Sequence, residues 1–154
     1  MNMPMIAQYM SPTPQTVRPG TNAAVALKMM KQFKIRHLPV TEDGRVVGII
    51  SDRDLRAIAC VASLDGYDVR QIMTKDPYRV KMTASLADVS MAMSRNKYGA
   101  AIVLGKDDEV AGIFTTTDAT KVLAVLLKKI TSGTSAMEDV SMVLHSSTQP
   151  RWRR

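Results

Sequence analysis

The sequence contains the same short motif twice, as GIISDRD at residues 48–54 and as GIFTTTD at residues 112–118. The similarity extends upstream, because IAQYMSPTP and VRQIMTKDP match at five positions that are all 63 residues apart. After one inserted residue the offset becomes 64, which places Asp54 over Asp118. A chance match would not keep its register over this length, so we interpret the chain as two copies of one unit.

The residue pattern of each copy predicts the same order of helices and strands. Together these elements would make an α/β fold of the α+β type. Thr21 is expected to cap the first helix, and Ser85 with Asp88 forms a capping-box pattern before its counterpart. Polar turns separate the paired β-rich runs. The expected order is β-α-β-β-α in each copy, over residues 16–18, 22–33, 37–40, 45–50 and 52–62, and again over residues 78–80, 86–96, 100–104, 110–114 and 117–129.

The composition predicts a cytoplasmic globular protein. The chain has 154 residues, of which 45% are hydrophobic and 23% are charged, as is ordinary for one domain. No apolar run reaches the roughly 18 residues of a membrane span, and the N-terminus lacks a signal-peptide pattern. A single cysteine, Cys60, and two histidines, His37 and His145, argue against a metal cluster.

The doubled motifs resemble those of the CBS domain, a family named after cystathionine β-synthase whose domains occur as pairs called Bateman modules. The resemblance rests on YMSPTPQTV and IMTKDPYRV at the starts of the copies, on LPV at residues 38–40, and on GIISDRD and GIFTTTD. It predicts a first unit over residues 6–64 and a second over residues 65–130. Residues 131–154 form an extension with a basic tail outside the family pattern.

The resemblance implies two β-α-β-β-α units that pack through their sheets with pseudo-two-fold symmetry and leave two clefts between them. Family members bind adenosine compounds in these clefts, among them AMP, ADP, ATP and S-adenosylmethionine. The motif suits this task, because a carboxylate accepts hydrogen bonds from both ribose hydroxyls. Hydroxyl side chains and free N–H groups at a helix start suit a phosphate.

Carried over by position, Asp54 and Asp118 would hold ribose hydroxyls. Ser51 and Thr115 would face phosphate or ribose. The other ligand-binding residues that the resemblance implies are Thr16, Val17, Tyr78 and Val80 around the adenine, His37, Leu38, Pro39, Gly99, Ala100 and Ala101 in the facing wall, and Arg53 and Thr117 beside the two motifs.

A structural role competes with each of these assignments. Ser51 with Asp54, and Thr115 with Asp118, also fit helix capping boxes, which satisfy backbone donors at a helix start. His37 fits a hydrogen-bonded residue at a strand edge, and we favour that role for it.

The two units also differ near the motif. Arg53, with Arg36 nearby, brings positive charge to a phosphate in the first unit, whereas Thr117 stands at the position equivalent to Arg53 in the second. Occupation of only one cleft is therefore an open alternative.

The function expected from these features is that of a non-catalytic regulatory module. We find no serine, histidine and acid set and no Walker loop that would indicate an enzyme. The module is expected to bind AMP, ADP or ATP and to relay this occupancy to a protein target in trans. The resemblance also implies a homodimer that associates through helices. The methionines at positions 29, 30, 91 and 93 would serve core or subunit packing.

The alternative is a nucleic-acid-binding protein or a ligand-free protein-interaction module. The formal net charge of +7 leaves nucleic acid open as a partner, and residues 151–154 contribute three arginines to it. Salt-sensitive binding that deletion of this tail abolishes would favour nucleic acid. Elsewhere in the extension, Ser135 with Glu138 is expected to cap a short helix.

Overall fold

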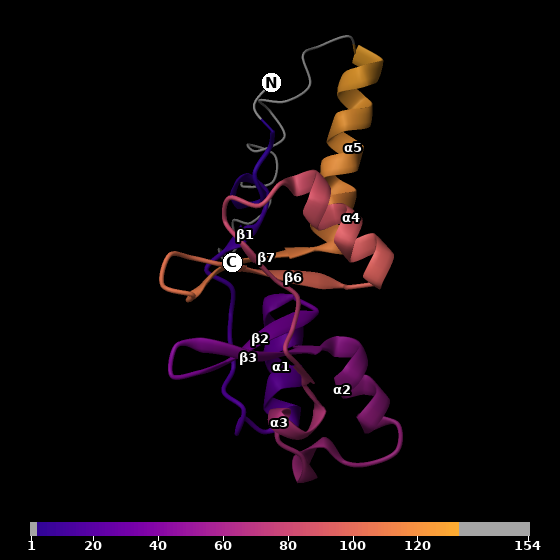
Figure 1. The fold of residues 1–154 in the computed structure, drawn as a ribbon. Helices are drawn as coiled ribbons and strands as arrows, with labels where there is room; N and C mark the ends of the chain where they lie inside the picture. The colour runs from indigo at the N-terminus through magenta and orange to yellow at the C-terminus, as the bar shows by residue number, and fades with distance from the viewer. Residues whose placement is uncertain (1–2, 133–154) are drawn as a thin grey trace, which may run out of the picture.

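A computed structural model describes residues 3–132 of the chain, which form two halves stacked one above the other (Figure 1). The first half, lower in Figure 1, is built on a sheet of strand order β2-β3-β4, and the second half on a sheet of order β1-β7-β6-β5. The elements of the first half are α1 (Ala23–Phe33), β2 (His37–Glu42), β3 (Arg45–Ser51), α2 (Asp52–Ala59), the 3-10 helix η2 (Leu64–Gly66), α3 (Val69–Ile72) and β4 (Thr74–Lys75). Those of the second half are the 3-10 helix η1 (Ile6–Gln8), β1 (Ser11–Pro12), β5 (Arg79–Lys81), α4 (Leu86–Asn96), β6 (Ala100–Leu104), β7 (Val110–Thr115) and α5 (Thr116–Ser132).

The two sequence repeats have the same local structure at their helix ends and in their hairpins. Helices α1 and α4 both end at a lysine in the left-handed conformation, Lys34 with φ 53° and Lys97 with φ 57°. The hairpins β2–β3 and β6–β7 both shift register, after Val40 and after Val103, which lie 63 residues apart. The prediction of an α+β fold made of two repeated units that pack through their sheets is confirmed.

The start of each repeat pairs with the last strand of the other repeat. Strand β1 lies antiparallel to β7, with Pro12 opposite Gly112, and β4 lies antiparallel to β3, with Gly48 opposite Lys75. The strand predicted over residues 78–80 is present as β5, parallel to β6. The strand predicted over residues 16–18 is wrong, because this segment contributes only a bridge between Val17 and Val40.

Each hydrophobic core therefore contains residues of both repeats. Ile6, Tyr9 and Met10 are buried in the second half with Phe114, although they belong to the first repeat. In the same way, Val69 from the second repeat is buried in the first half, with Ile72 and Met73 packed against that core. A division of the chain between residues 64 and 65 thus separates the repeats in sequence but cuts through both cores in space.

Two methionines of the first helices are core residues. Met30 in α1 and Met93 in α4 are 1% and 3% exposed and belong to the first and the second core. Met29 packs against the first core, whereas Met91 is exposed. The repeated methionines therefore serve mainly the interior of each half.

The cap of the first helix differs from the prediction. Asn22, not Thr21, is the N-cap of α1, and its side-chain oxygen accepts from the N–H groups of Ala24 and Val25. The hydroxyl of Thr21 instead accepts from the N–H of Arg18, which closes the turn before the helix. Asparagine and threonine both cap well, so the sequence alone does not decide between neighbouring positions.

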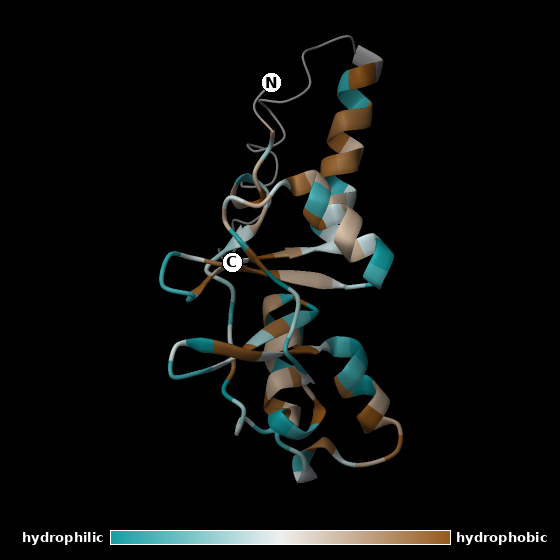
Figure 2. Cartoon of the chain, in the orientation of Figure 1, coloured by the Kyte–Doolittle hydropathy of each residue, from teal (hydrophilic) through white to brown (hydrophobic). Residues whose placement is uncertain are grey.

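Helix α5 runs away from the body of the second half, and apolar residues continue along it to its far end (Figures 1 and 2). Within residues 3–132, no helix combines the length and the apolar character that a membrane crossing needs. No cluster of three or more potential metal ligands occurs in the same part of the chain. The helix expected after Ser135, His145 and the basic residues 151–154 lie outside the described residues.

Candidate functional site

A cavity of about 1220 Å³ lies between the two halves, and we call it the central cleft. The first half contributes the start of β2, the end of β3 and the first turn of α2. The second half contributes the segment before β5, the last turns of α4, the start of β6 and the first turns of α5. A ligand in this cleft would touch both halves at once.

The structure brings seven of the predicted residues together on the wall of this cleft, and separates the other nine from it. Thr16 and Val17 lie beside a separate depression next to residues 41–44. Leu38, Pro39 and Ala101 are buried, and Val80 packs against the second core. The lining of the cleft includes Thr116 and Thr120 of α5 but not Thr115, Thr117 or Asp118. The predicted residues that do line it are His37, Ser51, Arg53, Asp54, Tyr78, Gly99 and Ala100.

Asp54 is held at the start of α2 by the capping box that its spacing from Ser51 predicts. Its Oδ2 accepts from the backbone N–H of Ser51 at 3.0 Å and from the hydroxyl of Ser51 at 2.6 Å. The N–H of Asp54 donates back to that hydroxyl at 3.2 Å. Within residues 3–132, every hydrogen bond shown for this carboxylate uses Oδ2. Capping thus fixes the half-buried side chain and leaves Oδ1 able to accept from a ligand.

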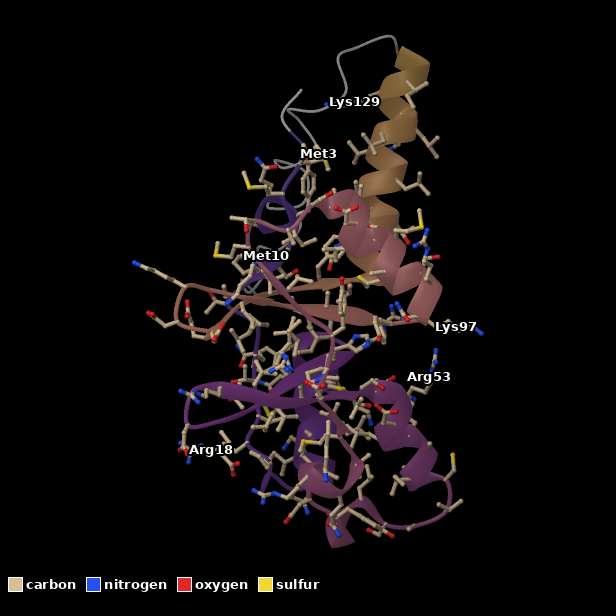
Figure 3. All side chains as sticks on the ribbon, viewed as in Figure 1. Met3, Met10, Arg18, Arg53, Lys97 and Lys129 are labelled. Atoms are coloured by element: carbon tan, nitrogen blue, oxygen red, sulfur yellow. The ribbon has the colours of Figure 1, made fainter. Side chains whose placement is uncertain are left out.

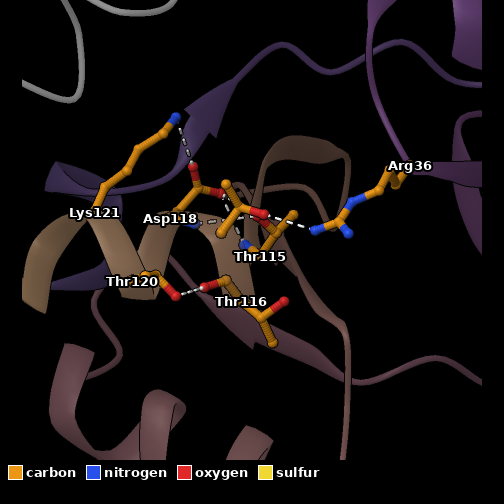
Figure 4. A network of polar contacts seen from close by, with 7 residues as sticks. Arg36, Thr115, Thr116, Asp118, Thr120 and Lys121 are labelled. Atoms are coloured by element: carbon orange, nitrogen blue, oxygen red, sulfur yellow. Dashed lines mark hydrogen bonds and ion pairs between the residues drawn. The ribbon is translucent and has the colours of Figure 1, made fainter.

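Asp118 forms the same capping box but also contacts further protein groups (Figure 4). Its Oδ2 accepts from the N–H and the hydroxyl of Thr115, at 2.9 Å and 2.7 Å. Its Oδ1 lies 3.8 Å from the ammonium of Lys121, and the residue is 6% exposed. The neighbouring Thr117 hydroxyl accepts from the guanidinium of Arg36 at 2.8 Å. The second motif is therefore satisfied from within the chain to a greater degree than the first.

His37 lies where the two halves meet. A Cβ atom at Gly99 would lie only 2.8 Å from Nε2 of His37, so the ring approaches the second half through the space that this glycine leaves. Burial lowers the pKa of His37, and the positive charge of Arg36 lowers it further. His37 is therefore held in its neutral form at neutral pH.

Two tyrosines of the second half stack beside each other on the cleft wall. The ring centroids of Tyr78 and Tyr98 are 5.1 Å apart with an interplanar angle of 23°. Burial raises the pKa of Tyr78, so its hydroxyl stays protonated. Such a pair offers an aromatic surface to a planar ring.

The C-terminal part of α4 also lines the cleft, through Ser90, Ser94 and Lys97. Sequence reasoning missed these residues, because a repeat shows which elements each unit contains but not how the two units face each other. Figure 3 shows Lys97 and Arg53 on the same side of the molecule, where the second half meets the first.

Comparison with known proteins identifies the family of this fold. The family model for the CBS domain matches twice, over residues 6–59 and 69–125. The chain belongs to the CBS domain family. The two CBS matches coincide with the two repeats of the sequence, so the predicted tandem pair is confirmed.

Relatives of similar length and longer relatives both match this CBS pair. A CBS domain-containing protein of Dictyostelium discoideum is 28% identical over 138 residues, which is 82% of this chain and 95% of that protein. An uncharacterized protein of Methanocaldococcus jannaschii is 23% identical over 111 residues, or 71% of this chain, which spans only 36% of that longer protein.

Solved structures of CBS proteins share the fold. A putative acetoin utilization protein from Vibrio cholerae has a TM-score of 0.74 and 26% identity, with 85% of this chain and 98% of that chain covered. CBSX2 from Arabidopsis thaliana has been solved in complex with AMP. That structure has a TM-score of 0.68 and 26% identity, and the match covers 80% of this chain and 98% of the CBSX2 chain.

Proposed function

We propose that this CBS pair is a non-catalytic regulatory module that binds an adenosine-containing nucleotide, AMP, ADP or ATP, in the central cleft. The observation that carries the proposal is the placement of Asp54 on the wall of this cleft. One of its carboxylate oxygens is fixed by Ser51, and the other accepts no hydrogen bond from the residues of the described range 3–132. A carboxylate held in this way is suited to accept from ribose hydroxyls.

The other groups of the cleft match the remaining parts of a nucleotide. The tyrosine pair of Tyr78 and Tyr98 offers a stacking surface for adenine. Arg53 supplies positive charge for a phosphate next to the start of α2, where backbone N–H groups favour anions. The complex of the related CBSX2 with AMP is consistent with an adenosine ligand in a pair of this fold.

We further propose that only one nucleotide binds per chain. Asp118 is almost fully buried and lies near Lys121, and Arg36 donates to Thr117 beside it. A ribose at this second motif would have to displace these contacts, whereas a ribose at Asp54 would not. The working site is therefore the cleft that contains the first motif.

The regulatory step follows from the position of the cleft. A ligand that contacts both halves stabilises the relative arrangement that binds it best, and this change in population passes to a protein target in trans. We propose a cytoplasmic homodimer, which is supported by exposed apolar side chains on three helices, namely Val25, Met91, Leu123 and Ile130.

Thermal unfolding with and without ligand tests this function. AMP, ADP, ATP and S-adenosylmethionine are compared on the native chain, on Asp54→Ala and on Asp118→Ala. A ligand at one hundred times its dissociation constant adds about 2.7 kcal/mol of stability, which is visible as a raised midpoint. Both substitutions remove a cap, so each variant is compared with its own ligand-free midpoint.

The expected result is a shift for a nucleotide on the native chain that Asp118→Ala keeps and Asp54→Ala loses. If no compound shifts the native chain, the nucleotide-binding function is wrong for this panel. Binding to a protein partner or to nucleic acid then becomes the leading explanation of the module.

A further inference from the structure

The central cleft carries a surplus of positive charge. Its lining contains four cationic side chains and three carboxylates, but two of the carboxylates already have partners. Asp76 pairs with Arg79 at 2.5 Å, and Asp52 pairs with Arg56, which lies outside the lining, at 2.8 Å. The groups that remain are the cations Arg36, Arg53 and Lys97, and the carboxylate Asp54.

Two of these cations come from opposite halves. Arg53 belongs to the first turn of α2 in the first half, and Lys97 follows α4 in the second half. Both are exposed, both line the cleft, and neither forms a salt bridge with another residue of the described range 3–132. Figure 3 shows them on the same side of the molecule, at the boundary between the halves.

We propose that Arg53 and Lys97 form a two-sided clamp for the terminal phosphates of the ligand, so that the cleft selects a nucleoside di- or triphosphate. This inference rests on the proposed nucleotide-binding function and specifies the ligand class of the same site. A polyphosphate that extends between Arg53 and Lys97 is attracted to cations on both halves, whereas the single phosphate of AMP reaches fewer of these charges.

The same charges disfavour the other adenosine ligands. S-adenosylmethionine carries a positive sulfonium, which the cations of the cleft repel. Adenosine and AMP use the ribose and adenine contacts but leave one or both sides of the clamp without a phosphate. The clamp also gives the ligand a direct way to draw the halves together, because its two residues lie on different halves.

Isothermal titration calorimetry on the complete chain tests the clamp, with ATP, ADP and AMP as probes in buffer that contains a chelator of divalent cations. The variants are Arg53→Gln and Lys97→Gln, which keep most of the side-chain length while removing the charge. Lys106→Gln is the matched control, because Lys106 is exposed in the turn between β6 and β7, outside the cleft. Thermal midpoints without ligand check that each variant is folded.

We expect the native chain to bind ATP about tenfold more tightly than AMP or better, as two charged contacts would give. Each clamp variant is expected to weaken the binding of ATP about three- to tenfold, and Lys97→Gln is expected to change the affinity for AMP less than about twofold. Lys106→Gln should leave all three affinities unchanged.

The opposing outcomes separate the clamp from the proposed function. If AMP binds as tightly as ATP, or if Lys97→Gln weakens the binding of AMP and ATP equally, the clamp is wrong while nucleotide binding stands. If none of the three nucleotides binds, the proposed function and the clamp fail together.

Discussion

His37 connects the protonation state of one side chain to the contact between the halves. Its ring lies against Gly99, and both burial and the charge of Arg36 lower its pKa below the ordinary value of 6.5. The unfolded chain takes up a proton at this residue at a higher pH than the folded chain does. The stabilising contribution of neutral His37 is therefore complete above about pH 6.5 and is lost as the pH falls through the lowered pKa.

The substitution His37→Gln tests this linkage. The free energy of unfolding of the native chain, measured by urea unfolding between pH 8 and pH 5, should decrease toward low pH more steeply than that of the variant. Near pH 8 the two slopes should agree, because His37 is neutral in both the folded and the unfolded chain there. Parallel curves for the native chain and His37→Gln would contradict the account, because they would show that His37 has the same pKa in both states.

The sequence predicts some site residues better than others, and the reason is locality. The capping boxes of Ser51 with Asp54 and of Thr115 with Asp118 depend on contacts three residues apart, and both are present. Lys97 enters the cleft only because the end of α4 faces the first half. That contact depends on how two units pack, which a repeat pattern does not encode.

At the scale of the elements, Gly48 and Gly112 explain how the first strand of each repeat can pair with the last strand of the other repeat. A Cβ atom at Gly48 would lie 2.6 Å from Sδ of Met73 and 3.0 Å from the carbonyl oxygen of Thr74. Gly112 makes the equivalent approach to Met10. The glycine of each final strand thus makes room for the methionine that precedes β4 or β1.

Gly48→Ala should destabilise the chain by about 1–3 kcal/mol, because the added methyl group overpacks the contact with Met73 and the backbone of Thr74. Gly20→Ala is the matched control, since a Cβ atom there meets nothing within 4 Å. Urea unfolding measures both changes. Equal stabilities of the two variants would contradict the proposed close approach.

Strands β1 and β4, which each pair with the last strand of the other repeat, are also the part of the fold that local patterns predicted least well. The run at residues 16–18 reads as a strand, but it forms only a bridge at Val17, while β1 lies earlier, at Ser11–Pro12. A two-residue strand that contains a proline has almost no sequence signature. Its pairing with Gly112, far along the chain, is a tertiary contact.

At the scale of the whole molecule, the exchange makes the two halves depend on each other. A fragment of residues 65–132 would lack Ile6, Tyr9 and Met10, which are at most 8% exposed in the second core. Burial of each such side chain contributes about 1.5–3 kcal/mol, so their loss approaches the 5–15 kcal/mol that stabilises a typical domain.

We therefore expect fragments 1–64 and 65–132 to be unfolded when separate and to gain structure when mixed. Circular dichroism during heating measures this, with the complete chain as the reference. A cooperative transition of either fragment alone, near the midpoint of the complete chain, would show that each repeat folds independently and would contradict the shared cores.

The crystal structure of the chain grown with saturating ATP tests the central claim most directly. We predict one nucleotide per chain in the central cleft, with its ribose hydroxyls donating hydrogen bonds to the carboxylate of Asp54 and its phosphates lying near Arg53 and Lys97. A nucleotide seated against Thr115 and Asp118 instead, or an empty central cleft at saturating ATP, would contradict it.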